Sequence, residues 1–376
     1  MNPRVLSVYR TYFPDPPGGL QEAIRQICLS TQKFGVDNTI FTLSPRPIPQ
    51  RIESMEADVV RYKSWWAPAS CDLGDPRAFF AFKRLSRKTD LLHYFFPWPF
   101  ADVLHAVSSP TPPAMMTYIS DVVRQRWLGK LYQPLMESTL RNMKVIVANA
   151  PGYVDSSAIL SRPEIRKKVE IIPLGIDETS YPRPAQASVL TQFGLHPNEK
   201  FFVFVGVHRY YKGLHFLLQA ARATQAKIVI IGTGPESASL RQTVLAEGLN
   251  SVCFTGQVSD EVKLALIRHS IALVLPSHLR SEAYGMVLVE AAMSGRPMIS
   301  CEIGTGTSFV NKHMRTGIVV KPQDPGALAV AMNSFVADEA MTREMGFAAR
   351  QRYEQLFSGS ACGKAYGEVY QQVLTR

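Results

Sequence analysis

Short, continuous apolar runs rich in β-branched and aromatic residues alternate along this chain with stretches of helical spacing. A strand with one solvated face would alternate apolar and polar residues, so an uninterrupted run predicts a strand buried on both faces. Such strands are typical of parallel sheets covered by helices, and we therefore expect an α/β fold with doubly wound sheets. The runs are RVLSVYR, NTIFTLS, LLHYFF, AMMTYIS, VIVANA, VEIIPLG, FFVFVGV, KIVIIGTG, SVCFTG, IALVLPS, PMISCEIG and TGIVV.

The runs form two groups, separated by the proline-rich, polar stretch IDETSYPRPAQASVL. At 376 residues the chain exceeds the roughly 150 residues typical of one domain. The sequence thus predicts one Rossmann-like domain over residues 1–178 and a second over 195–352. Residues 353–376 are expected to form a terminal helix.

Composition excludes several classes of protein. Hydrophobic residues make up 46% and charged residues 19%, which excludes a disordered chain. The net charge of +10 is spread over both halves, which fits an anionic ligand or an anionic membrane surface better than a nucleic-acid-binding arm. Five scattered cysteines without a Cys-x-x-Cys pair indicate neither a disulfide framework nor a zinc site.

The chain carries no signal for crossing or leaving a membrane. No apolar run approaches the roughly 18 residues that span a bilayer. The N-terminal MNPRVLSVYR lacks the apolar core of a secretory signal. We therefore expect a cytoplasmic protein.

Ligands of open parallel sheets bind beyond the carboxyl ends of the strands, so candidate residues are sought there. The first strand runs into Gly18 and Gly19, which are expected to open a helix. Free backbone N–H groups and the helix dipole at that point favour an anion such as a diphosphate. A tight turn that requires two glycines is the alternative.

The first strand of the second group ends in VGVHRYYKG, with Arg209 and Lys212. A diphosphate leaving group needs cations, and these two residues offer a guanidinium fork and an ammonium point charge. The alternative is a solvated basic loop, but the segment is unusually apolar around its two cations.

The stretch RSEAYGMVLVEAAMSG carries two acids eight residues apart. In a continuous helix their carboxylates would lie about 12 Å apart, too far for a shared-proton pair. We expect the helix to start near Gly285, so that the amides of Gly285, Met286 and Val287 face a phosphate. Glu282 then lies in the preceding loop, and Glu290 accepts hydrogen bonds from a ribose. The alternative is two ordinary glutamates on a helix surface.

RSEAYGMVLVE resembles the E-x7-E motif of retaining family-4 glycosyltransferases, and the companion motifs of that family follow in the right order. The resemblance covers nearly the whole chain and is strongest in the second half. Two further segments, GTGTSFV and PWPFAD, look most like mannosyl- or rhamnosyltransferases of bacterial surface polysaccharides. The companions are the Gly18–Gly19 loop, GVHRYYKG, IIGTGPE, FTGQVSDEVK, LPSHLRSEAYG and SGRPMISCEIGTGTSFV.

The resemblance implies a GT-B fold, in which two Rossmann-like domains face each other across a cleft. It implies that the C-terminal domain binds the donor, that the N-terminal domain binds the acceptor, and that the last helix crosses back. Metal-independent transfer is also implied, in agreement with the lack of an Asp-x-Asp pair.

The resemblance further implies residue roles. Arg209 and Lys212 would bind the donor diphosphate, Glu282 the donor sugar and Glu290 the ribose. Contacts to the base would come largely from the backbone near Val258.

The sequence departs from the family at two positions. Ile119 stands where many members carry a histidine beside the transferred sugar, and Phe95 replaces the second histidine of a His-x-His pair. Either the donor is a 6-deoxyhexose, whose missing hydroxyl suits an apolar neighbour, or activity is weakened or lost. Asp121 is the acid nearest the expected acceptor and a candidate base; capping the next helix is its alternative role.

Because no nucleophile is well placed, retention implies that the leaving diphosphate accepts the acceptor's proton. Arg209, Lys212 and the helix amides would stabilise the diphosphate as it leaves.

Residues 121–144 interleave basic and apolar side chains. This segment is either a peripheral contact with the inner face of an anionic membrane or a core-packed helix with a basic side.

The leading interpretation is a retaining transferase that moves a hexose or 6-deoxyhexose from a GDP-sugar to a lipid-linked glycan of an O-antigen-like polysaccharide. A non-catalytic nucleotide-sugar-binding or complex-partner protein is the second interpretation. A nucleotide-sugar epimerase of the same fold is the third.

Overall fold

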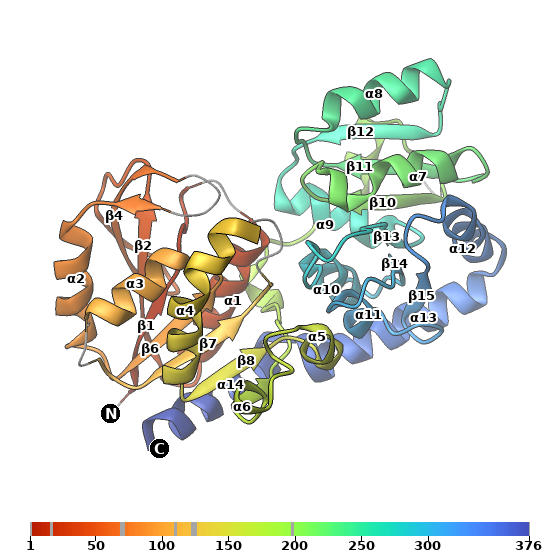
Figure 1. The fold of residues 1–376 in the computed structure, drawn as a ribbon. Coiled ribbons are helices and arrows are strands. Elements are labelled where there is room, and N and C mark those ends of the chain that lie inside the picture. The colour runs from red at the N-terminus through yellow and green to blue at the C-terminus, as the bar shows by residue number, and fades with distance from the viewer. Residues whose placement is uncertain are drawn as a thin grey trace. The chain divides into compact units, whose positions relative to one another are not determined.

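The computed structural model describes residues 2–15, 18–67, 72–108, 111–121, 126–196 and 199–375, with the backbone alone over 126–131. The chain divides into two compact units (Figure 1). The first comprises Met1–Asp177 and Gly359–Arg376, and the second comprises Glu178–Ser358. The unit boundaries therefore lie at 177/178 and 358/359, whereas the sequence prediction places a linker after residue 178 and the terminal helix from residue 353.

The first unit is built on a nine-stranded sheet, in the order β3-β4-β2-β1-β6-β7-β8-β9 with β5 paired to β4. All pairings are parallel except those of β3 and β5 with β4. The central strands are buried along their whole length, as the apolar runs predict. The strands are β1 (Arg4–Val8), β2 (Asp37–Ser44), β3 (Arg51–Glu53), β4 (Asp58–Trp66), β5 (Leu73–Gly74), β6 (Leu91–Phe96), β7 (Ala114–Tyr118), β8 (Val145–Ala148) and β9 (Val169–Ile171).

The helices of the first unit include one from the far end of the chain. They are α1 (Gly19–Gln32), α2 (Arg77–Ser86), α3 (Pro99–Val107), α4 (Arg126–Asn142), α5 (Pro151–Ser156), α6 (Pro163–Arg166) and α14 (Gly359–Thr375). α14 packs against α1 and β6. Two glycines allow this close approach: a Cβ at Gly363 would lie 2.4 Å from the Ser30 carbonyl oxygen, and one at Gly359 would lie 2.7 Å from Asp177 Cβ.

A buried polar chain fastens α14 to the sheet. The His93 ring of β6 is hydrogen-bonded through Nδ1 to the Tyr370 hydroxyl, at 2.9 Å, and through Nε2 to the Thr117 hydroxyl, at 2.7 Å. Thr117 also contacts the Tyr366 hydroxyl at 3.1 Å. Burial lowers the pKa of His93 to about 3, so the imidazole is neutral at physiological pH.

Acid should therefore loosen this attachment. The unfolded chain takes up a proton at His93 near the ordinary pKa of 6.5, whereas the folded chain resists protonation down to about pH 3. The stability that His93 contributes is thus complete above pH 6.5 and falls at lower pH, by about 1.4 kcal/mol per pH unit at most. We expect wild type to lose about 2 kcal/mol more than His93→Gln between pH 7 and pH 5. Urea unfolding at both pH values measures this difference, and equal losses in the two proteins would contradict it.

The second unit contains a six-stranded, entirely parallel sheet in the order β12-β11-β10-β13-β14-β15. Counted from the first strand of the unit, this is the order 3-2-1-4-5-6 of a Rossmann fold. The predicted pair of Rossmann-like sheets is confirmed. The strands are β10 (Phe201–Val205), β11 (Lys227–Ile231), β12 (Val252–Gly256), β13 (Leu273–Leu275), β14 (Met298–Cys301) and β15 (Gly317–Val320).

Helices α7 to α11 of the second unit connect its successive strands, and α12 and α13 follow the last strand. The helices of this unit are α7 (Leu214–Ala221), α8 (Ser237–Ala246), α9 (Asp260–His269), α10 (Met286–Met293), α11 (Thr307–Val310), α12 (Pro325–Ala337) and α13 (Glu339–Arg352), with 3₁₀ turns η2 (Glu178–Ser180), η3 (Ala187–Phe193) and η4 (Tyr210–Lys212) and the π-helical η5 (Tyr353–Phe357). Within the described ranges, no helix has the length and apolar character needed to cross a bilayer.

Candidate active site

The strand order of the second unit reverses between β10 and β13, and ligands of such sheets bind at this switch point. The two segments singled out in the sequence follow these two strands. Arg209 and Lys212 come after β10, and Glu282 comes after β13 in the loop that leads to α10. The fold therefore brings together residues about 70 positions apart in the sequence, as the separation of Lys212 and Glu282 shows.

The turn that carries the two cations is fixed against the loop after β13. Gly213 adopts φ +70°, and a Cβ there would lie 2.1 Å from the Pro276 carbonyl oxygen. The His278 backbone N–H donates to the Tyr211 carbonyl at 3.0 Å. Arg209 precedes the η4 turn in extended conformation and its side chain is exposed. Its guanidinium is thus accessible to a ligand, while Lys212 is held inside.

Lys212 and Glu282 form an ion pair that is largely buried. The Ser277 hydroxyl donates to the same carboxylate oxygen, Oε2, at 3.0 Å, and the Thr305 hydroxyl donates to the Glu282 carbonyl at 2.8 Å. Burial opposes the charged form of Lys212, but the Glu282 carboxylate outweighs it and the net effect is a raised lysine pKa. The ammonium therefore stays charged in the site.

α10 begins where the sequence predicts it. Gly285 precedes the helix with φ +83°, a left-handed conformation that favours glycine. The first amides of any helix lack partners within it, so those of Met286 and Val287 are available to an anion. Both residues are half-buried at the entrance to the helix.

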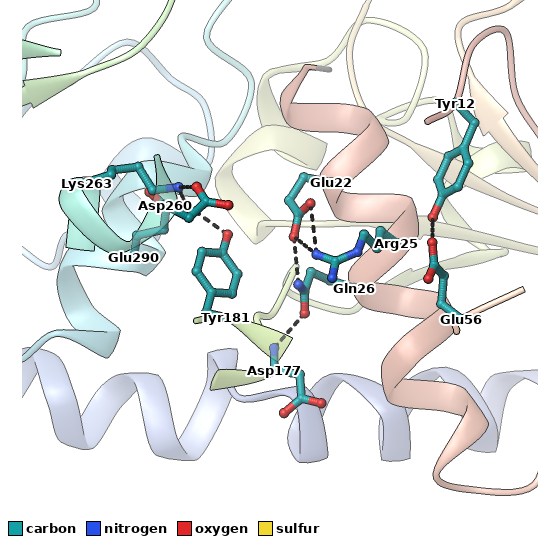
Figure 2. A network of polar contacts seen from close by, with 10 residues as sticks. All are labelled: Tyr12, Glu22, Arg25, Gln26, Glu56, Asp177, Tyr181, Asp260, Lys263 and Glu290. Carbon is teal, nitrogen blue, oxygen red and sulfur yellow. Dashed lines mark hydrogen bonds and ion pairs between the residues drawn. The ribbon is translucent and has the colours of Figure 1, made fainter. Parts of the chain in front are cut away.

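Glu290, inside α10, is buried and has two partners (Figure 2). Its Oε1 accepts a hydrogen bond from the Tyr181 hydroxyl at 2.9 Å and from Lys263 Nζ at 2.8 Å. The alternative of an ordinary surface glutamate is therefore excluded at this position. Neither Tyr181 nor Lys263 was singled out in the sequence, because each lies on another element: 109 and 27 residues away respectively.

Comparison with known proteins fits this geometry. Residues 18–175 match a glycosyl transferase 4-like domain, and residues 189–352 match the family model of glycosyl transferases group 1. The chain is 44% identical to the D-rhamnosyltransferase WbpZ of Pseudomonas aeruginosa over 94% of its own length and 92% of that protein. It is 38% identical to O-antigen chain mannosyltransferase C of Escherichia coli over 99% of both chains.

The chain belongs to the group 1 glycosyltransferases.

Solved structures agree on the fold of this glycosyltransferase. Sucrose-phosphate synthase from Thermosynechococcus elongatus superposes with a TM-score of 0.83 at 23% identity, over the full length of both chains. Anabaena HepE in complex with UDP gives 0.81 at 18% identity, over 98% of this chain and all of that one. The resemblance stated from the sequence is thus confirmed for family and for the GT-B architecture.

The remaining predicted donor residues of the glycosyltransferase lie at helix entrances. Val258 is half-buried in the loop between β12 and α9. Gly18 directly precedes α1 of the first unit, as expected, with an ordinary extended φ of −145°. A Cβ at Gly19 would meet nothing within 4 Å. Neither glycine is therefore required by a tight left-handed turn.

Asp121 and Ile119 follow β7 of the first unit. The Asp121 Oδ1 accepts from the Tyr118 hydroxyl at 2.9 Å and from the Ser157 hydroxyl at 2.7 Å. Its backbone N–H donates to the Tyr153 hydroxyl at 2.7 Å. Ile119 is half-buried beside it. A role of Asp121 in capping the next helix depends on residues 122–125, which lie outside the described residues.

Phe95 differs from what the sequence comparison implied. Its ring is buried in the core of the first unit, stacked on His93 at a centroid distance of 4.2 Å. At this position the aromatic ring therefore packs in the core of the first unit, and its meaning for the donor stays a prediction. In the basic segment at 121–144, residues 122–125, Arg124 among them, lie outside the described residues, and the side chains of 126–131 are not described, so the interleaving of its charges stays a prediction.

Proposed function

We propose that this glycosyltransferase is a retaining, metal-independent enzyme that moves a mannose- or rhamnose-type sugar from a GDP-linked donor to a lipid-linked glycan. The product would be a surface polysaccharide of the O-antigen kind. The relatives named as a D-rhamnosyltransferase and an O-antigen mannosyltransferase support this choice of sugar and acceptor.

The observation that carries the proposal is the grouping of Lys212, Glu282 and Glu290 around the start of α10. A nucleoside diphosphate placed at the α10 amides would meet the charged Lys212, and Arg209 would supply a second cation. The ribose would then bind Glu290, and the sugar would lie near Glu282. Gly19 supports close approach of a ligand to the first unit, because the fold alone does not require a glycine there.

In the proposed mechanism the diphosphate leaves as the acceptor hydroxyl attacks the same face of the sugar. The departing oxygen accepts the acceptor's proton, and Arg209, Lys212 and the α10 amides stabilise the developing charge. Lys212 is paired with Glu282. A diphosphate that binds Lys212 would share this cation, so that Glu282 could accept a hydrogen bond from a sugar hydroxyl. Trapping a covalent sugar on Glu282 would replace this mechanism by double displacement.

The apolar side chain of Ile119 supports a 6-deoxyhexose donor, since a missing hydroxyl leaves no polar group unpaired beside it. Peripheral contact with a membrane is supported by Trp65 and Trp66 at the end of β4, which are 62% and 64% exposed. Tryptophan favours the membrane–water interface. Co-sedimentation with anionic vesicles tests this part of the proposal.

Donor binding is tested by calorimetric titration with GDP-mannose, GDP-rhamnose and UDP-glucose. We expect one GDP-sugar to bind and Glu290→Ala to weaken it about tenfold to a hundredfold, as the loss of hydrogen bonds to a charged group implies. Glu344→Ala, an exposed glutamate of α13 in the same unit, is the matched control and should change nothing. Absence of binding to every donor would favour the non-catalytic interpretation instead.

A further inference from the structure

The two oxygens of the Glu290 carboxylate have different surroundings. Oε1 accepts from both the Tyr181 hydroxyl and Lys263 Nζ, at 2.9 and 2.8 Å. Among the residues that the structure describes, none donates a hydrogen bond to Oε2 within the limits of such a bond. Since the side chain is only 9% exposed, its orientation is set by these partners and not by bulk water.

Lys263 is itself fixed on several sides. It is one turn into α9 and pairs with Asp260 at 2.8 Å as well as with Glu290. Its ammonium also lies 5.2 Å from the centre of the Tyr181 ring, within the range of a cation–π contact. Burial opposes its charge, but the two carboxylates prevail and the lysine pKa is raised. The Glu290 carboxylate is thus paired with a lysine ammonium that keeps its positive charge.

Tyr181 is held by the first turn of the second unit. Its backbone N–H donates to the Glu178 carbonyl at 3.2 Å. The Glu178 carboxylate accepts two bonds from the Arg350 guanidinium of α13, at 3.0 and 2.8 Å. Arg350 also donates to the carbonyl of Met293 at the end of α10. The phenol therefore approaches Glu290 from a segment that α13 fixes in place, and Figure 2 shows the phenol pointing toward the carboxylate.

We propose that Tyr181 and Lys263 are positioning residues for donor binding, which hold Oε1 of Glu290 so that Oε2 faces the ribose hydroxyls. A carboxylate with one oxygen fixed by a phenol and an ammonium cannot rotate away, so the other oxygen is preorganised as an acceptor. This inference rests on the proposed function in one respect, that Glu290 binds the ribose. It adds two residues that touch the donor only through Glu290.

The test compares ligands that differ in the ribose alone. Calorimetry with GDP and 2′,3′-dideoxy-GDP, repeated with UDP and 2′,3′-dideoxy-UDP, is applied to wild type, Tyr181→Phe, Lys263→Met and Glu290→Ala. Tyr181→Phe keeps the ring over Lys263 and removes one hydrogen bond. We expect it to weaken binding of the ribonucleotide about fivefold, and to leave the dideoxynucleotide within about twofold. Lys263→Met should also weaken binding of the ribonucleotide and spare the dideoxynucleotide, and its effect on the ribonucleotide should be larger.

The controls separate positioning from folding. Lys200→Met removes an exposed ion pair with Glu339 in the same unit and should leave both affinities unchanged. If Tyr181→Phe weakens both ligands equally, the tyrosine has only a structural role and the inference is overturned. The inference is also overturned if Tyr181→Phe and Lys263→Met bind the ribonucleotide like wild type.

Failure of the underlying proposal would look different. In that case wild type itself would not distinguish the ribonucleotide from its dideoxy form, and Glu290→Ala would bind both as wild type does. This result would show that Glu290 does not bind the ribose. Tyr181 and Lys263 would then have no role in positioning it for the donor.

Discussion

Lys212→Met should remove most sugar transfer, lowering kcat/KM about a hundredfold to a thousandfold, the usual effect of deleting one group that stabilises developing charge. Methionine keeps the length of the side chain but not the ammonium that pairs with Glu282. The leaving diphosphate would then depend on the exposed Arg209 and the α10 amides. Initial rates with donor and acceptor varied separately measure the effect.

The same substitution leaves the Glu282 carboxylate buried, with the Ser277 hydroxyl as its remaining partner among the described residues. Breaking a buried ion pair in this way costs about 3–5 kcal/mol. Lys212→Met combined with Glu282→Gln separates the two consequences, because it removes the unpaired charge. We expect the double variant to recover thermal stability but not activity. Lys227→Met, which removes a more exposed pair with Glu199, is the control. If Lys212→Met keeps more than a tenth of wild-type kcat/KM, the proposed leaving-group role is wrong.

Gly363→Ala should destabilise the first unit by about 1–3 kcal/mol or more, as overpacking of a close contact does. Its new Cβ would lie 2.4 Å from a backbone oxygen of Ser30, which cannot move without shifting α1. Gly367→Ala is the matched change one turn later on α14. There the nearest atom lies 3.8 Å away, so the variant should gain about 0.5–1 kcal/mol from the better helix propensity of alanine.

Urea unfolding of the two variants and of wild type measures the expected loss of stability in Gly363→Ala and the expected gain in Gly367→Ala. Equal midpoints for Gly363→Ala and wild type would mean that α14 does not approach α1 as closely as the structure has it.

The parts of the fold that sequence could predict are those set by local pattern. Six apolar runs of the second unit correspond to its six strands, and Gly285 marks the start of α10 because the chain needs a left-handed residue there. By contrast β4 was not among the predicted strands. Polar and charged residues interrupt its apolar ones near the edge of the sheet, so it lacks a continuous apolar run.

The site was predictable only in part, for a similar reason. A motif identifies Glu282 and Glu290 by spacing, but their partners depend on which elements the fold places beside them. Tyr181 reaches Glu290 from 109 residues away, and nothing in its local sequence announces that contact. Phe95 shows the converse, since a position chosen by motif comparison turned out to pack in the core against His93.

The return of α14 to the first unit has a consequence for biosynthesis. Proteins emerge from the ribosome N-terminus first, at about 5–20 residues per second, and domains generally fold in that order. Here α14, the last helix of the first unit, is synthesised only after the whole of Glu178–Ser358. At those rates this delays completion of the first unit by about ten to forty seconds. The His93 ring and the face of α1 next to Ser30 lack their cover for that time. The second unit, a continuous stretch, is therefore the part of this enzyme that can mature first, and a stop codon just before Gly359 would release a finished second unit joined to an unfinished first one.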